Sequence, residues 1–270
     1  MLAVSFGLFG LIVGSFLNVV ILRHGARTLG GRSGCLSCGH ALAWYDLLPV
    51  VSWILLSGRC RYCGSHISLQ YPLVEFSAAL LFALLGSSSL SYITLALALA
   101  MSAFLILIVA YDIRHTIIPD EWAYSFAALA FISSLIGMVQ VGGGTILLPF
   151  IFSGPVCALP LYLLWLFSRG AWMGLGDAKL ALGMGWLLGI SLGLSALLLS
   201  FIIGAVVSVF ILMPFEYLKH HMGTTRLGRT NKRFTMKSEI PFGPFLVLST
   251  IIVWFMTLHG VALPFFIYPL

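Results

Sequence analysis

Residues 91–122 read "SYITLALALAMSAFLILIVAYDIRHTIIPDEW", and this stretch decides the fold class. A helix that crosses the hydrocarbon layer of a membrane needs about 20 predominantly apolar residues. The stretch supplies them without a charged residue before Asp112. It therefore predicts a membrane-spanning helix over 91–111 with a carboxylate at its edge.

The rest of the chain repeats this pattern, since 60% of its residues are hydrophobic and only 8% are charged. We expect an all-α, polytopic membrane protein of about eight transmembrane helices. The sixth apolar segment is short and rich in glycine, so a seven-helix fold with a re-entrant sixth segment is the alternative. We expect the first segment to be a retained helix, because no basic residue precedes it and no small-residue cleavage site follows it. The predicted segments are 2–22, 72–88, 91–111, 121–139, 145–167, 178–191, 193–215 and 242–263.

The basic residues predict the orientation, because cytoplasmic loops collect Lys and Arg. Of the 14 Lys and Arg residues, 13 lie in alternate connecting segments, and Lys179 lies one residue beyond such a segment. We therefore place 23–71, 112–120, 168–178 and 216–241 inside and both termini outside. A basic inner face beside anionic lipid accounts for the net charge of +6, so we expect no nucleic-acid partner. The basic stretch 216–239 is predicted to be a solvated loop, with a lipid or substrate contact as the alternative.

Two carboxylates fall at matched membrane depth on the inner side. Asp112 is predicted to end the third helix, and Asp177 to open the sixth in "GLGDAKL", residues 174–180. Carboxylates at membrane depth are costly and usually functional. Glycines at 174 and 176 remove side chains beside Asp177, so another backbone or an extended peptide could approach it. Cys157 and the histidines lack the partners of a nucleophilic site, so we expect Cys157 to be a core residue.

The loop after the first helix contains two C-x-x-C-G motifs, at Cys35 and Cys38 and at Cys60 and Cys63. A two-residue spacer lets both thiolates of a knuckle bind one tetrahedral ion. We predict one structural zinc site formed by these four cysteines. Two disulfides are the main alternative, but the charge pattern places the loop in a reducing compartment. Redox chemistry and free thiols are further alternatives, and His40 and His66 lie close enough in sequence to compete as ligands.

Over nearly its whole length, the chain resembles the bacterial type IV prepilin peptidases, also called leader peptidase and N-methyltransferase. The resemblance rests on seven ordered motifs, which are the two cysteine knuckles and "GSFLNVVILR" (14–23), "WYDLLPVVSW" (44–53), "ISLQYPLVE" (67–75), "YDIRHTIIPD" (111–120), "GLGDAKL" (174–180) and "IPFGPFL" (240–246).

The resemblance implies an aspartyl protease of the inner membrane that removes the leader of prepilins and pseudopilins at the cytoplasmic face. Many members of the family also methylate the new N-terminus with S-adenosylmethionine. Carried over by motif, the catalytic residues are Asp112 and Asp177, and Asp120 also matches. No nucleotide-binding fold is visible, and Glu75 is a guess for the methyl-donor site. An ion-coupled transporter and a non-catalytic assembly protein of a secretion system are the alternative functions.

The expected organisation has three parts. Residues 1–22 form the first transmembrane helix, 23–71 the cytoplasmic zinc loop, and 72–270 the protease core. The expected partners are prepilin or pseudopilin substrates and membrane lipid.

Overall fold

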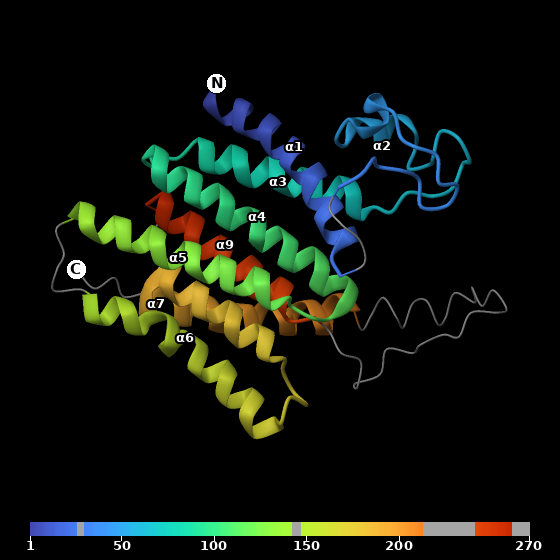
Figure 1. Ribbon diagram of the computed structural model, residues 1–270. Coiled ribbons are helices and arrows are strands. Elements are labelled where there is room, and N and C mark those ends of the chain that lie inside the picture. Colours follow the sequence, from blue (N-terminus) through green and yellow to red (C-terminus); the bar gives the residue numbers. More distant parts are fainter. Residues whose placement is uncertain (26–29, 142–146, 213–240, 261–270) are drawn as a thin grey trace.

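The computed structural model describes residues 1–25, 30–141, 147–212 and 241–260 (Figure 1). Its described residues form helices and two isolated bridges but no β-strand, so the all-α prediction is confirmed. The basic segment 216–239 lies outside the described residues. The elements are α1 (Leu2–Arg23), the short 3-10 helix η1 (Trp44–Leu47), α2 (Val51–Leu55), α3 (Gln70–Gly86), α4 (Tyr92–His115), α5 (Asp120–Val141), α6 (Leu147–Ser168), α7 (Leu175–Val207), the π-helical turn η3 (Ser208–Leu212) and α9 (Gly243–Leu258).

The long helices lie side by side in one bundle, and the chain between α1 and α3 forms a separate lobe that contains α2 (Figure 1). Within the described residues, five helices are long and apolar enough to cross a membrane, namely α1, α4, α5, α6 and α7. Helices α3 and α9 are apolar but shorter, with 17 and 16 residues. The protein is therefore a multi-pass membrane protein, and the figure of eight crossings stays a prediction.

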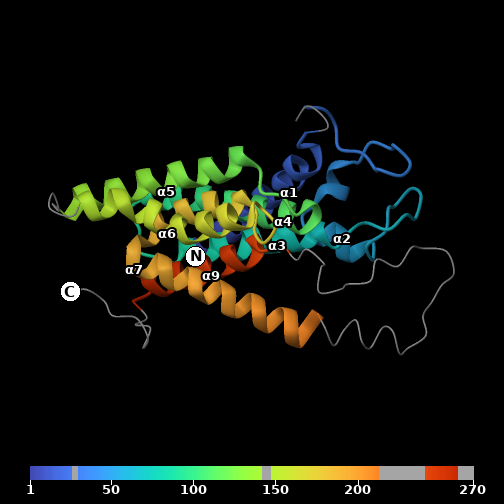
Figure 2. The ribbon, with the colours of Figure 1, turned by 90° about the horizontal axis from the view of Figure 1, so that it is seen from below.

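Helix α7 is folded back on itself. Its 33 residues would extend about 50 Å as a straight helix, well beyond the roughly 30 Å hydrocarbon layer. Gly189 interrupts it with φ 79° and ψ 177°, a conformation that glycine adopts far more easily than other residues. A Cβ on Gly193 would lie 3.4 Å from the Cα of Gly185, although these residues are eight positions apart. The two predicted segments 178–191 and 193–215 thus correspond to two arms of α7, which Figure 2 shows running in different directions.

Small residues let α1 lie close against α3. A Cβ on Gly10 would lie 2.5 Å from the carbonyl oxygen of Ala78, and one on Gly14 would lie 2.7 Å from the Cα of Glu75. Such close approach is the usual way for helices to pack in lipid, where apolar burial between helices gives little driving force. The Asn18 amide adds a polar contact by donating to the carbonyl of Tyr71 at 3.1 Å.

The centre of the bundle is built where α4, α5, α7 and α9 meet. Fully buried side chains from each helix fill it, including Ile108, Phe126, Leu180 and Leu246. Helix α4 runs to His115, so Asp112 lies in its last turn instead of ending it as predicted. Thr116 caps the helix in the left-handed conformation, with φ 53°. The short connection to α5 therefore packs against the bundle beside the first turn of α7.

Candidate active site and metal centre

Asp112 is held at the contact between α4 and α9. Its side chain is buried, and Oδ2 accepts a hydrogen bond of 3.0 Å from the backbone N–H of Gly243, the first residue of α9. A Cβ at position 243 would lie 2.5 Å from that oxygen, so only glycine fits there without displacing the carboxylate. The carboxyl of Asp112 is thereby oriented by a residue 131 positions away in the sequence.

Asp177 lies in the first turn of α7 and is also buried. Ile118, from the connection between α4 and α5, packs against the glycine before it. A Cβ on Gly176 would lie 2.8 Å from the Cβ of Ile118, and a Cβ on Gly243 would lie 3.3 Å from its Cδ1. Ile118 therefore contacts both Gly243, which binds Asp112, and Gly176, which precedes Asp177. We predicted that Gly176 makes room for another chain to approach Asp177. In the structure, the side chain of Ile118 fills the space beside Gly176.

The structure thus brings together the two predicted aspartates. Both carboxyls are buried, and Ile118 packs on the glycine that adjoins each of them, Gly243 at Asp112 and Gly176 at Asp177. Two carboxyls that share a buried site cannot both ionise without a large cost, which favours a state in which the pair holds one proton. A protonated and an ionised carboxyl side by side can act as general acid and general base toward a peptide bond and a water molecule.

Asp120 and Lys179 lie outside this buried pair. Lys179 Nζ is 2.6 Å from Asp120 Oδ1, and it lies 5.4 Å from the centre of the Tyr124 ring. The Asp120 side chain is 63% exposed. At 3.6 residues per turn, Lys179 lies about 160° around α7 from Asp177. The ion pair therefore faces away from the buried aspartates.

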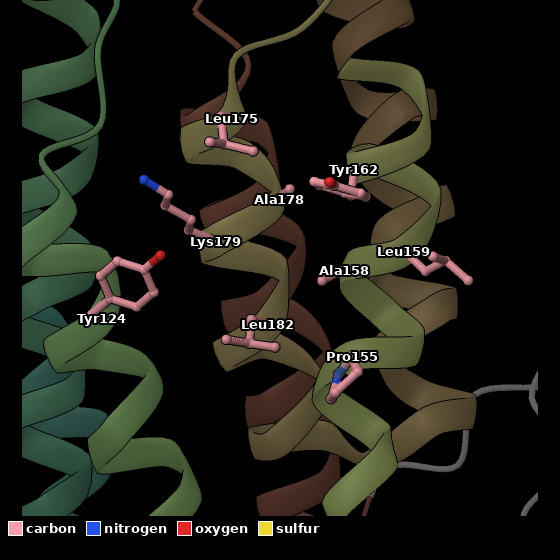
Figure 3. Close-up of a pocket in the computed structure, with 9 residues that line it drawn as sticks. All are labelled: Tyr124, Pro155, Ala158, Leu159, Tyr162, Leu175, Ala178, Lys179 and Leu182. Atoms are coloured by element: carbon pink, nitrogen blue, oxygen red, sulfur yellow. The ribbon is translucent and has the colours of Figure 1, made fainter. Parts of the chain in front are cut away.

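Lys179 instead borders an open groove between α5, α6 and α7 (Figure 3). The groove has a volume of about 340 Å³ and a mostly apolar lining, with Tyr124 and Tyr162 among its polar side chains. Leu175, which also lines it, is two residues before Asp177, so the groove follows the far side of α7. Its lining residues are Tyr124, Pro155, Ala158, Leu159, Tyr162, Leu175, Ala178, Lys179 and Leu182.

The two cysteine motifs fold into matching knuckles. In the first, Gly39 N–H donates to Cys35 O at 2.9 Å and Cys35 N–H donates to His40 O at 3.0 Å. In the second, the equivalent bonds run from Gly64 to Cys60 and from Cys60 to Ser65, at 2.9 and 2.8 Å. The glycine closing each turn has a positive φ, 70° in Gly39 and 69° in Gly64. Glycine is needed there because a Cβ is unfavourable in this conformation.

The knuckles bring all four predicted sulfur ligands into one cluster. The sulfur atoms of Cys35, Cys38, Cys60 and Cys63 lie within 4.8 Å of one another. Cys35 Sγ and Cys63 Sγ are 3.8 Å apart, and Zn–S bonds of about 2.3 Å in a tetrahedron place sulfurs about 3.8 Å apart. Hydrogen bonds from the backbone of Cys38 and Ser37 lower the pKa of Cys35 to about 6, whereas desolvation and the thiols of Cys63 and Cys35 raise the pKa of Cys38 to about 11, so the thiolate is favoured at Cys35 and not at Cys38.

His40 and His66 are not part of the cluster. The His40 ring stacks on Tyr62 with 3.7 Å between ring centres, and His66 pairs with Arg59 in an isolated backbone bridge. The donor set is four sulfurs, which suits a closed zinc site.

Comparisons with known proteins bear on both parts of the chain. The bacterial peptidase A24 N-terminal domain matches residues 8–88, which include the cysteine cluster, and the type IV leader peptidase family matches residues 99–209, which include both aspartates. A prepilin leader peptidase/N-methyltransferase of Pectobacterium carotovorum is 33% identical over 213 residues, covering 68% of this chain and 74% of the relative. The chain belongs to the prepilin leader peptidase/N-methyltransferase family.

Other members of the family match over almost the entire chain. Relatives of the same name from Vibrio cholerae and Bacillus subtilis are each 28% identical. The match covers 93% of this chain and 96% of the Vibrio relative, and 94% of this chain and of the Bacillus relative. No solved structure matches the chain significantly. The family resemblance found in the sequence is confirmed.

Two contacts of this prepilin peptidase family member were not predicted from its sequence. The motif "IPFGPFL" was recognised, but nothing in it indicated that Gly243 contacts Asp112. Ile118 likewise lies in the recognised motif "YDIRHTIIPD", but the sequence did not indicate a role for it. The sequence offers only that Gly243 and Ile118 each stand directly before a proline, Pro244 and Pro119, which does not identify a partner.

Glu75 lies elsewhere, at the contact between α3 and the cysteine loop. It is buried, and its Oε2 accepts a hydrogen bond of 2.7 Å from the backbone N–H of Val50. A carboxylate used in this way does not offer S-adenosylmethionine an open binding group. Glu75 thus links α3 to the cysteine loop, and its assignment to the methyl-donor site stays a prediction.

Proposed function

We propose that this chain is a membrane aspartyl endopeptidase that cleaves the leader of type IV prepilins or pseudopilins. The observation that carries the proposal is the buried pair Asp112 and Asp177, held together in a chain whose relatives are named prepilin leader peptidase/N-methyltransferase. By the same family membership, we propose that the chain also methylates the new N-terminus, with S-adenosylmethionine as donor.

In the proposed reaction, the ionised carboxyl of the pair takes a proton from a water molecule as the water attacks the scissile carbonyl. The protonated carboxyl donates to the carbonyl oxygen, and a proton then passes to the leaving amine as the peptide bond breaks. Gly243 N–H supports this by fixing the direction of Asp112. The location at the end of α4 suits a substrate whose cleavage point lies just before an apolar helix in the bilayer.

Three further parts of the proposal rest on charge and ligand chemistry. The distribution of Lys and Arg supports an active site facing the cytoplasm and both termini outside the inner membrane. Cys35, Cys38, Cys60 and Cys63 would hold a structural zinc ion that stabilises the 23–71 loop. Residues 1–22 would form the first membrane helix and 72–270 the protease core.

The test is cleavage of a prepilin substrate by membranes that contain wild type, Asp112→Asn or Asp177→Asn. Each Asn variant keeps the size of the side chain but cannot act as the ionised base, so we expect cleavage to be lost while insertion and expression persist. Asp120→Asn is the matched control, because this aspartate is exposed and paired with Lys179. Full cleavage by Asp112→Asn or Asp177→Asn would refute the assignment of these residues as catalytic. Loss of cleavage only in Asp120→Asn would show that the active site includes Asp120 instead.

A further inference from the structure

The loop between α1 and α3 carries an exposed apolar surface outside the metal cluster. It covers one side of η1 and α2, which contact each other. Trp44 is 77% exposed and Leu55 is 76% exposed, values unusual for large apolar side chains facing water. We call this surface the loop patch, and its members are Trp44, Leu47, Val51, Ile54 and Leu55, all exposed.

The opposite side of α2 holds the lobe together. Trp53 packs over Gly58, where a Cβ would lie 2.8 Å from the indole ring, and its Nε1 donates to Ile67 O at 3.3 Å. Val51, Ile54 and Leu55 follow the i, i+3, i+4 spacing that places residues on one side of a helix. The lobe thus has an inner side, where Trp53 contacts the residues that flank the second knuckle, and an outer apolar side, the loop patch, whose side chains are exposed.

A hydrogen bond sets the level of the loop patch relative to the membrane helices. Val50 N–H donates to Glu75 Oε2 at 2.7 Å, and Gly14 of α1 packs on the backbone of Glu75. Gly14 is nine residues before Arg23, the last residue of α1, which is about 13 Å at 1.5 Å per residue. The chain next to the loop patch is therefore tied to a level well inside the end of α1.

The pictures agree with this placement. In Figure 1, α2 lies to the right of α1 and above the right-hand end of α3, and Figure 2 again shows α2 next to α3. Glu75 is only three residues, about 5 Å, inside the start of the predicted segment 72–88, so a surface tied to it lies near the boundary between water and lipid. Trp and Tyr are the side chains that favour that boundary, because their rings are apolar and their N–H or O–H groups are polar.

The charge of the loop suits a lipid surface as well. Residues 23–69 contain five arginines and one aspartate, a formal charge of +4. Four thiolates with one bound Zn²⁺ would add −2, which leaves +2 on the loop. Anionic headgroups attract a basic segment of this kind, and an apolar face beside it adds burial in the acyl boundary.

We propose that the loop patch is embedded in the surface of the leaflet on its own side of the membrane, with Trp44 at the level of the lipid headgroups. The cysteine loop is then a lobe that rests in the membrane surface beside α1 and α3. The hydrogen bond between Val50 and Glu75 and the contact of the loop patch with lipid both help to hold it there.

The test uses the complete protein, labelled with fluorotryptophan and placed in nanodiscs of phosphatidylethanolamine and phosphatidylglycerol. Fluorine NMR signals of Trp44 and Trp53 are assigned by Trp→Phe replacement. Line broadening is then measured with lipids spin-labelled near the headgroup and, separately, with a water-soluble gadolinium chelate. Trp53 is the matched control, because it lies in the same lobe but faces inward.

We expect the spin-labelled lipid to remove most of the Trp44 signal and to affect Trp53 less, with little effect of the chelate on Trp44. Ile54→Glu together with Leu55→Glu should abolish the lipid effect on Trp44, while the zinc content stays unchanged. If the chelate broadens Trp44 and the lipid label does not, the proposal is overturned. If, in addition, a prepilin peptide protects Trp44 from the chelate, the loop patch is a substrate surface. None of these measurements depends on peptidase activity.

Discussion

Gly243→Ala is the change that tests how Asp112 is positioned. The added Cβ would lie 2.5 Å from Asp112 Oδ2, whereas ordinary contact begins near 3.4 Å, so the carboxylate must move by about 0.9 Å, the difference of the two distances. Such a shift disrupts the 3.0 Å hydrogen bond from Gly243 N–H. Hydrogen bonds to charged groups contribute about 1.5–3 kcal/mol. At about 1.4 kcal/mol per factor of ten, we expect kcat/KM to fall about 10-fold to 100-fold.

The assay is cleavage of a prepilin substrate by purified protein in nanodiscs, with thermal unfolding measured on the same samples. Gly7→Ala is the matched control, because a Cβ there meets Ala83 at an ordinary 3.4 Å and alanine favours a helix. Unchanged kcat/KM in Gly243→Ala would refute the argument. It would also be refuted if the loss of activity simply followed a loss of folded protein.

The other parts of the structure allow three more predictions. Purified protein should contain about one zinc per chain, and Cys35→Ser with Cys60→Ser should remove it, as measured by metal analysis; an intact protein without metal would contradict the site. Glu75→Ala should increase hydrogen exchange in residues 41–57 and leave α4 and α7 unchanged, because Glu75 binds Val50 N–H; equal exchange would show that the contact holds nothing in place. Arg61→Gln should lower the thermal stability of the loop only slightly, because the side chain of Arg61 is 46% exposed and the buried Asp46 carboxylate keeps its hydrogen bonds from Ala43 N–H and Tyr62 O–H; a loss of zinc in this variant would assign the pair a larger role.

Local sequence patterns predicted the elements of this protein well. Apolar runs of membrane length located the helices, since lipid forces the backbone to form its hydrogen bonds within each segment. The cysteine spacing predicted the cluster, because each knuckle is closed by hydrogen bonds within five or six residues of chain. The break in α7 was indicated only by the glycine-rich sixth segment. Its fold-back geometry depends on one backbone conformation, at Gly189, that hydropathy does not encode.

The contacts around the aspartates could not be predicted in the same way. The sequence placed Asp112 and Asp177 at the same membrane depth, because one was predicted near the end of a helix and the other at the start of a helix. Equal depth does not show which helices lie next to each other in the plane of the membrane. Which helices meet is decided by small residues that permit close approach, such as Gly176 against Ile118. Such a contact involves residues far apart in the chain, so neither hydrophobic periodicity nor spacing reveals it.

The contacts that position Asp112 and Asp177 also limit how the chain around them can move. Gly243 and Gly176 both leave no room for a Cβ, and both meet Ile118, so these contacts resist separate movement of the connection after α4, the first turn of α7 and the start of α9. A buried pair of carboxyls needs that rigidity, because the sharing of one proton depends steeply on the separation of the two charges. Room for a substrate therefore has to come from the sides of the pair that these contacts leave open, and not from the space beside the two glycines.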